Sequence, residues 1–120
     1  MPPHHAIDYV EIPVRDLAEA KRFYGDAFGW AFTDYGPAYA GIQGDGREVG
    51  GLAASDALRE TGGGPLVILY SDDLEASLAA VEAAGGTVST PPFGFPGGRR
   101  FHFRDPSGNE LAVWGHADRA

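Results

Sequence analysis

The chain has 120 residues, 43% of them hydrophobic and none of them cysteine, so we expect one packed domain without disulfides or thiolate metal ligands. Its formal net charge of −8 disfavours binding to the phosphate backbone of nucleic acids. No apolar run has the length of a membrane span and no signal-peptide pattern is visible, so we expect a cytoplasmic protein without a membrane partner.

The first half of the chain predicts a strand, a helix and three further strands. Apolar side chains alternate over residues 7–14, which is the period of a strand with one buried face. Asp16 follows as a helix N-cap, and apolar residues at helical spacing run from 17 to 28, where Gly29 ends the helix. Three short strands complete this half, at residues 30–35, 38–43 and 48–54.

The second half repeats this order after a polar connection at residues 55–64. Its predicted elements are a strand at 66–70, a helix that starts at 74 and ends at Gly85-Gly86, a short strand at 87–89, and two closing strands at 99–104 and 109–114. Residues 90–98 contain three prolines and predict a loop, which would lie over a binding cavity as a lid.

An internal repeat is the strongest structural signal. Asp16-Leu17 and Asp73-Leu74 lie 57 positions apart (16 to 73), and each pair starts a predicted helix. The repeat predicts two tandem βαβββ modules within a single α+β domain of residues 1–120. Module one covers about 5–54, and module two about 65–116. Neither module can bury its own sheet face alone, so we expect the two sheets to curve around a shared cavity.

Several motifs resemble a known family. They are Val10 to Leu17, Phe23-Tyr24, Phe28-Gly29-Trp30, Ala83 to Gly86, and the turn Asp105 to Asn109 followed by Glu110-Leu111. In their order and spacing they are similar to the modules of the vicinal-oxygen-chelate superfamily, which includes glyoxalases, bleomycin-resistance proteins and dioxygenases. The resemblance implies that both modules form a curved mixed sheet around a central cavity.

The resemblance also implies where a metal ion would be bound. In metal-dependent members, histidine or glutamate ligands stand at three positions that this chain fills with Tyr9, Leu66 and Ala112. Leucine and alanine side chains donate nothing to a metal, and tyrosine does so only as a phenolate. We therefore expect no metal ion and no cofactor at these positions.

The remaining candidates are mostly apolar or aromatic. Strand alternation places Glu11 on the same face as Tyr9, and it places His102 opposite the flanking Phe101 and Phe103. The predicted ligand-binding residues are Tyr9, Glu11, Leu66, Ile68, Tyr70, His102, Ala112 and Trp114. Glu11 and His102 are also the candidates for proton transfer. For the aromatic residues, ordinary core packing is the alternative, and for His102 it is a hydrogen bond across the sheet.

Two functions follow from these residues. The first is metal-independent binding of a small apolar or aromatic molecule between the modules, similar to bleomycin-resistance proteins, in a homodimer that the resemblance implies. The alternative is a glyoxalase-like isomerase, lyase or cyclase that uses Glu11 or His102 for proton transfer. A metal enzyme with displaced ligands, such as His102 and Glu110, would need a shifted strand register, which side-chain alternation resists. The sequence leaves the ligand's identity open.

Overall fold

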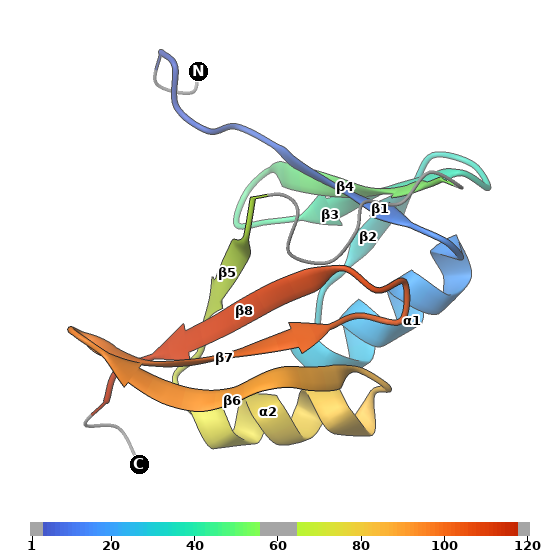
Figure 1. Cartoon of the computed structure of the whole chain (residues 1–120). Helices are drawn as coiled ribbons and strands as arrows, with labels where there is room; N and C mark the ends of the chain where they lie inside the picture. The colour runs from blue at the N-terminus through green and yellow to red at the C-terminus, as the bar shows by residue number, and fades with distance from the viewer. Residues whose placement is uncertain (1–3, 56–64, 118–120) are drawn as a thin grey trace.

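The computed structural model describes residues 4–55 and 65–117, which form two four-stranded mixed sheets and two helices (Figure 1). Module one consists of β1 (Val10–Val14), α1 (Leu17–Phe28), β2 (Phe32–Asp34), β3 (Tyr39–Gln43) and β4 (Glu48–Ala54). Module two consists of β5 (Val67–Tyr70), α2 (Leu74–Ala83), β6 (Thr87–Phe95), β7 (Gly98–Arg104) and β8 (Glu110–Gly115). Most of the predicted connection at 55–64 lies outside the described residues. Neither α1, with 12 residues, nor α2, with 10, has the length that a membrane-spanning helix needs.

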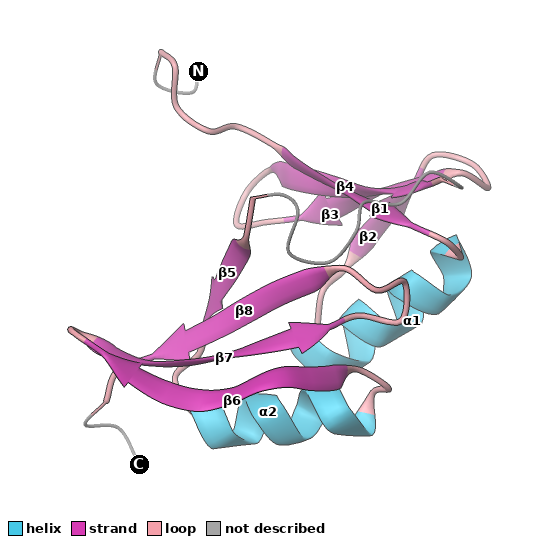
Figure 2. Cartoon of the chain, viewed as in Figure 1, coloured by secondary structure: helices cyan, strands magenta, loops and turns pink. Residues whose placement is uncertain are grey.

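The two sheets have the same topology, which confirms the predicted pair of βαβββ modules (Figure 2). Sheet A has the strand order β1-β4-β3-β2 and sheet B the order β5-β8-β7-β6. In each sheet the first strand pairs in parallel with the fourth, and the other pairs are antiparallel.

The start of each helix keeps the predicted offset between the modules. The side chain of Asp16 accepts a hydrogen bond from the backbone N–H of Glu19, and that of Asp73 accepts one from Ala76, both at 3.1 Å. Each aspartate thereby satisfies a backbone donor that the first helical turn leaves free. α1 ends at Gly29, whose φ of 72° lies in the left-handed region that glycine adopts without strain.

A single hydrophobic core joins the two modules. Ile12 and Val14 of β1 are buried, as the alternation predicts, and pack with the aromatic face of α1. The Phe23 ring of α1 lies 6.1 Å from the ring of Phe103 in β7. The helices therefore cover the inner faces of both sheets, and the opposite, outer faces remain for other contacts.

Polar contacts hold the end of β1 against the turn between β7 and β8. The Asn109 side chain donates to the backbone oxygen of Pro13 at 2.6 Å. The backbone N–H of Arg15 donates to the Ser107 hydroxyl at 3.0 Å, and its guanidinium donates to the backbone oxygen of Pro106. The turn that closes module two thus fixes the first strand of module one.

One predicted element is wrong. Residues 90–98 were expected to form a loop, but β6 continues to Phe95 and only a tight turn at residues 96 and 97 separates it from β7. β6 lies at the edge of sheet B, where a missing backbone N–H is tolerated. Its register shifts between Thr90 and Phe93, and this irregularity accommodates Pro91 and Pro92.

Candidate functional site

Four side chains form a hydrogen-bonded cluster on the outer face of sheet A. We call Tyr9, Tyr35, Tyr39 and Glu48 the tyrosine–glutamate cluster. The Tyr9 hydroxyl donates to Glu48 Oε2 at 2.9 Å and lies 2.7 Å from the Tyr39 hydroxyl, while the Tyr35 hydroxyl donates to Glu48 Oε1 at 2.7 Å. Either hydroxyl can donate in the bond between Tyr9 and Tyr39, because Tyr39 also has a carboxylate partner in Glu11.

Two glycines form the floor beneath this cluster. Gly41 of β3 and Gly51 of β4 are paired across the sheet. A Cβ atom on Gly41 would lie 2.2 Å from Glu48 Oε1, and one on Gly51 would lie 2.0 Å from the hydroxyl oxygen of Tyr39. Of this cluster, only Tyr9 was predicted from the sequence as a site residue. The signal that could have found the rest is a glycine inside each of two adjacent strands, which indicates the close approach of another group.

The cluster keeps its tyrosines protonated. The hydrogen bond to Tyr39, desolvation and the hydrogen bond to Glu48 together raise the pKa of Tyr9 well above its usual value. Burial, followed by the effect of Glu11, raises the pKa of Tyr39. Tyr9 is therefore a neutral phenol that donates a hydrogen bond to Glu48.

The three positions that would hold a metal ion in related proteins do not fit one here. Tyr9 is a neutral phenol, Leu66 has no donor atom, and Ala112 is fully buried in β8. In residues 4–55 and 65–117, no three His, Asp or Glu side chains are grouped so that they could hold a metal ion. His102 and Glu110 lie side by side, but two ligands are fewer than a protein zinc site uses.

The outer face of sheet B carries a histidine–carboxylate pair. Nδ1 of His102 lies 2.8 Å from Oε2 of Glu110. The strand register places His102 opposite Ala112, and Ala112 opposite Ile68 of β5. Nε2 of His102 is buried and has no hydrogen-bond partner among the described residues.

A second row of side chains on this face combines aromatic rings with an arginine. Tyr70, Trp114 and Arg100 are neighbours across β5, β8 and β7. The Trp114 ring lies 5.1 Å from that of Tyr70 and 6.4 Å from that of Phe95. Tyr70 is 48% exposed and Phe95 36% exposed, so these rings are available for further contacts.

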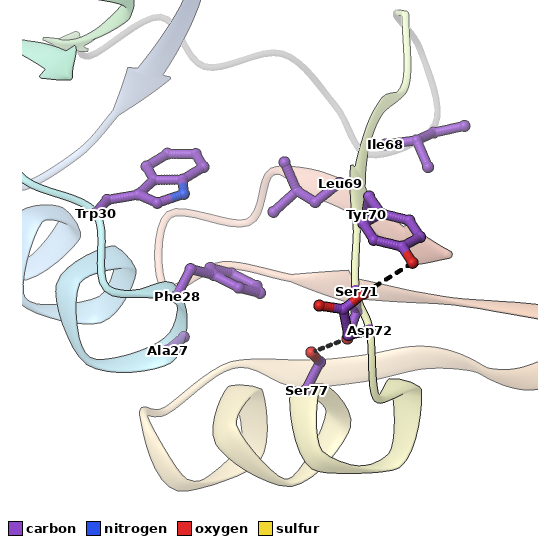
Figure 3. A pocket seen from close by; sticks show the side chains of 9 residues that line it. All are labelled: Ala27, Phe28, Trp30, Ile68, Leu69, Tyr70, Ser71, Asp72 and Ser77. Carbon is purple, nitrogen blue, oxygen red and sulfur yellow. Dashed lines mark hydrogen bonds between the residues drawn. The ribbon is translucent and has the colours of Figure 1, made fainter. Parts of the chain in front are cut away.

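A hollow lies between the two modules, at the side of β5 (Figure 3). Its volume is about 620 Å³, which is within the range of small-molecule pockets. Phe28 and Trp30, at the end of α1, form one wall. Figure 3 shows Leu69 pointing toward them from β5, and Ile68 and Tyr70, on the other side of that strand, line the edge of the hollow.

The lower rim of the hollow is polar. The Tyr70 hydroxyl donates to Asp72 Oδ1 at 2.9 Å, and the hydroxyl oxygens of Ser71 and Ser77 lie 2.6 Å apart (Figure 3). These groups can orient a molecule whose apolar part contacts the aromatic wall.

The structure divides the predicted ligand-binding residues into two groups. Tyr9 and Glu11 lie on the outer face of sheet A, where their neighbour is Tyr39. The others belong to β7, β8 and β5 or to the residue before β5: His102, Ala112, Trp114, Ile68, Tyr70 and Leu66. Of all these, Ile68 and Tyr70 line the hollow. Phe28, Trp30 and Leu69 were not predicted as site residues, because helical and strand periodicity assigns such side chains to the core.

The comparison with families agrees with this architecture. The profile of the Glyoxalase/Bleomycin resistance protein/Dioxygenase superfamily matches residues 6–113. The chain belongs to this superfamily.

Two relatives are similar to the chain in sequence. The chain is 30% identical over 129 residues to a glyoxylase-like domain-containing protein of Didymella fabae, covering 92% of this chain and 93% of that protein. It is 29% identical over 115 residues to CFP32, a candidate glyoxylase of Mycobacterium bovis, covering 89% of this chain. The chain spans only 44% of the length of CFP32.

Solved structures of superfamily members have the same fold. A glyoxalase-related enzyme from Fulvimarina pelagi has a TM-score of 0.78 and 22% identity, covering 93% of this chain and 88% of that one. TnmS3, an antibiotic binding protein from Streptomyces sp. CB03234, has a TM-score of 0.70 and 23% identity, covering 98% of this chain and 100% of that one. At these identities the likeness concerns the fold.

Proposed function

We propose that the chain binds a small apolar or aromatic molecule, without a metal ion, in the hollow between its two modules. The observation that carries the proposal is the hollow itself, which has a volume of about 620 Å³, is lined by both modules and combines aromatic rings with a polar rim. A molecule bound there would contact both modules at once, because residues of each module line the hollow.

The walls determine which molecules fit. Phe28 and Trp30 offer ring faces on one side, and Leu69 offers an aliphatic contact on the other. A flat molecule can stack on the rings, and aromatic pairs contribute about 0.5–1.5 kcal/mol beyond the area they bury. The Tyr70–Asp72 pair at the rim would orient one polar group of the ligand.

Metal-independent binding is supported by the chemistry of the superfamily's metal positions. Their donors are replaced by a protonated tyrosine and two aliphatic side chains. Binding must then rest on packing and hydrogen bonds. A precedent for binding within this fold is TnmS3, which is described as an antibiotic binding protein.

We also propose that the protein acts in the cytoplasm as a homodimer. The support for a dimer is the exposed apolar surface on sheet B, where Ile68 is 43% and Tyr70 48% exposed. Sedimentation equilibrium should give twice the chain mass of 12.7 kDa. A mass of one chain at micromolar concentration would contradict the dimer.

Filling the hollow tests the proposed binding site. Ala27 lines it from α1, so Ala27→Leu would occupy part of its volume without removing a core side chain. The matched control is Ala18→Leu, the same change on the same helix at an exposed position outside the hollow.

The measurement is a screen of aromatic metabolites and antibiotics against both variants, by thermal shift and then calorimetry. We expect at least a tenfold weaker Kd in Ala27→Leu and an unchanged Kd in Ala18→Leu. Equal affinities in the two variants would place the ligand elsewhere and overturn the proposal.

An enzyme is the second candidate, and the His102–Glu110 pair favours it. A carboxylate that accepts from Nδ1 orients the imidazole and leaves Nε2 for proton transfer. Glu11, the other candidate, lies exposed on the outer face of sheet A. If the chain is an isomerase, lyase or cyclase, mass spectrometry of a recovered ligand should show chemical change that His102→Gln abolishes and Ala18→Leu keeps. A ligand recovered unchanged after prolonged incubation would leave binding as the function.

A further inference from the structure

Among residues 4–55 and 65–117, Arg100 has no carboxylate partner. It lies half-buried on the outer face of β7, with its guanidinium carbon 5.4 Å from the ring centre of Phe93 and 5.8 Å from that of Phe95. Its neighbour Arg99 pairs with Glu75 at 2.9 Å. Arg100 has no such carboxylate among the described residues, and its Nε is buried without a hydrogen-bond partner.

Burying the Nε–H group of Arg100 costs free energy unless an acceptor binds it. A buried donor without an acceptor loses its hydrogen bonds to water and gains none in return. The faces of two phenyl rings offset part of the loss for Arg100 through cation–π attraction. They do not accept the Nε–H bond, so the guanidinium keeps an unused donor on the face of the sheet.

A second unused nitrogen lies beside it. His102 is two residues further along β7, on the same face, and its Nε2 is buried without a partner. The His102 ring lies 5.9 Å from that of Phe93, so the same phenyl ring adjoins both Arg100 and His102. Glu110 occupies Nδ1, so Nε2 is the ring nitrogen left for a further hydrogen bond, and it donates to a carboxylate when the ring carries both protons.

The charges select the acceptor. Arg100 carries one positive charge that no carboxylate of the described residues balances. A monoanion balances this single charge. The second charge of a dianion would have no local partner and would be repelled by a chain whose net charge is −8. The planar guanidinium matches the two oxygens of a carboxylate. The Phe93, Phe95 and Trp114 rings around it match an aromatic group.

We propose that the outer face of β7 binds the carboxylate of an aromatic monocarboxylic acid, with Arg100 as its main partner and His102 as a second donor. The rings of Phe93 and Phe95 cover the site at the end of the β6–β7 hairpin. They are 37% and 36% exposed and turn aside to admit the ligand. The site is separate from the hollow, because Arg100 lies two strands away from β5 in sheet B.

Two probes that differ only in charge test the proposal. Phenylacetate and phenylacetamide have the same shape, but only the former is an anion. Calorimetry on the full chain should show at least a tenfold preference for phenylacetate. Arg100→Gln should abolish this preference. Arg104→Gln, at an exposed position on the same strand, should retain it. Equal affinity of the two probes for the unmodified protein, or a preference that survives Arg100→Gln, would overturn the proposal.

Nitrogen NMR gives a second readout that needs no variant of the site. Of the described histidines, His4, His5 and His116 are exposed, whereas the His102 side chain is only 14% exposed. Phenylacetate should shift the Nε2 resonance of His102 and leave those of His4 and His5 unchanged, whereas His116 adjoins the Trp114 ring and is no reference. An unchanged His102 resonance at saturating phenylacetate would overturn the proposal. Ala27→Leu should not alter these results, so failure of the hollow as a binding site is distinguishable from failure of this one.

Discussion

Asp105 is a buried carboxylate whose lone pairs are almost fully used. It accepts from the backbone N–H groups of Ser107 and Asn109 at 2.9 Å each, and from the Asn109 side chain at 3.0 Å. The fourth donor is the Tyr24 hydroxyl of α1, at 2.9 Å. A buried charge is stable only with such partners, so this residue ties the closing turn of module two to the first helix.

Removing the Tyr24 hydroxyl should therefore destabilise the fold. Tyr24→Phe should lower the free energy of unfolding by about 1.5–3 kcal/mol, the range for hydrogen bonds to charged groups. Urea denaturation measures the change. The control is Tyr35→Phe, which removes a hydroxyl bonded to Glu48 at an exposed position and should change the stability far less. Equal effects of the two substitutions would contradict this account of Asp105.

The same contact predicts how stability depends on alkaline pH. Burial and then the charge of Asp105 raise the pKa of Tyr24 well above its unfolded value of about 10. Above pH ~10 the unfolded chain releases this proton while the folded chain keeps it, so stability falls as pH rises. Tyr24→Phe should make the decline shallower by up to about 1.4 kcal/mol per pH unit, measured by urea denaturation between pH 9 and 11. A decline of equal steepness in the two proteins would show that Tyr24 ionises normally.

For single residues, the sequence predicted the place of each side chain in its element better than its hydrogen-bond partners. Asp105 was expected in a turn and Tyr24 on the buried face of a helix, and both lie there. Their hydrogen bond joins positions 81 residues apart, which periodicity cannot relate. Which face His102 occupies followed from alternation with Phe101 and Phe103, but its pairing with Glu110 depends on the register of β7 and β8.

Among the elements, the β3–β4 pair needs glycine at Gly41 and Gly51, because Glu48 and Tyr39 lie directly over these two residues. Gly51→Ala should force Tyr39 off the sheet and destabilise the protein by about 1–3 kcal/mol, the usual cost of overpacking. It should also separate the Tyr9 and Tyr39 hydroxyls, which lowers the titration midpoint of Tyr9 in an ultraviolet pH titration.

The control for this substitution is Gly94→Ala in β6. An added Cβ there would have its nearest contact at 4.0 Å, which is ordinary van der Waals distance. Gly94→Ala should therefore leave the unfolding midpoint nearly unchanged. If both alanines were tolerated equally, the glycines beneath the tyrosine–glutamate cluster would not be required.

β6 shows where element prediction fails. Pro91 and Pro92 indicated a loop, because proline cannot donate to a strand ladder. The strand nevertheless forms, since it lies at the edge of sheet B and its register shifts beside the prolines. An edge position is a property of the assembled sheet, so the local sequence could not reveal it. The helices were easier, because their caps and apolar spacing are local signals.

For the whole molecule, metal independence gives a direct test. Protein dialysed against EDTA should keep its thermal midpoint within about 1 °C, because a metal bound only by the folded state would add to stability. Elemental analysis of protein purified without chelator is the companion measurement. Stoichiometric zinc, nickel, manganese or iron, with a lower midpoint after dialysis, would contradict the proposal.

The repeat predicted two modules but not their contacts with each other. Offsets in the sequence set the length of each unit and the position of its helix. The hollow, in contrast, arises where Phe28 and Trp30 of module one meet Leu69 of module two, and these are all side chains of ordinary core type. Only the packing of α1 against sheet B decides that they leave a space.

The contacts between β1 and the β7–β8 turn have a consequence for biosynthesis. Pro13 and Arg15 are bonded to residues that follow them by 91 to 96 positions, so a growing chain cannot make these bonds until Asn109 has left the ribosome. Until then the first strand lacks its anchor, and the nascent chain exposes apolar surface to chaperones and proteases. Completion of this fold therefore waits until the β7–β8 turn has been synthesised.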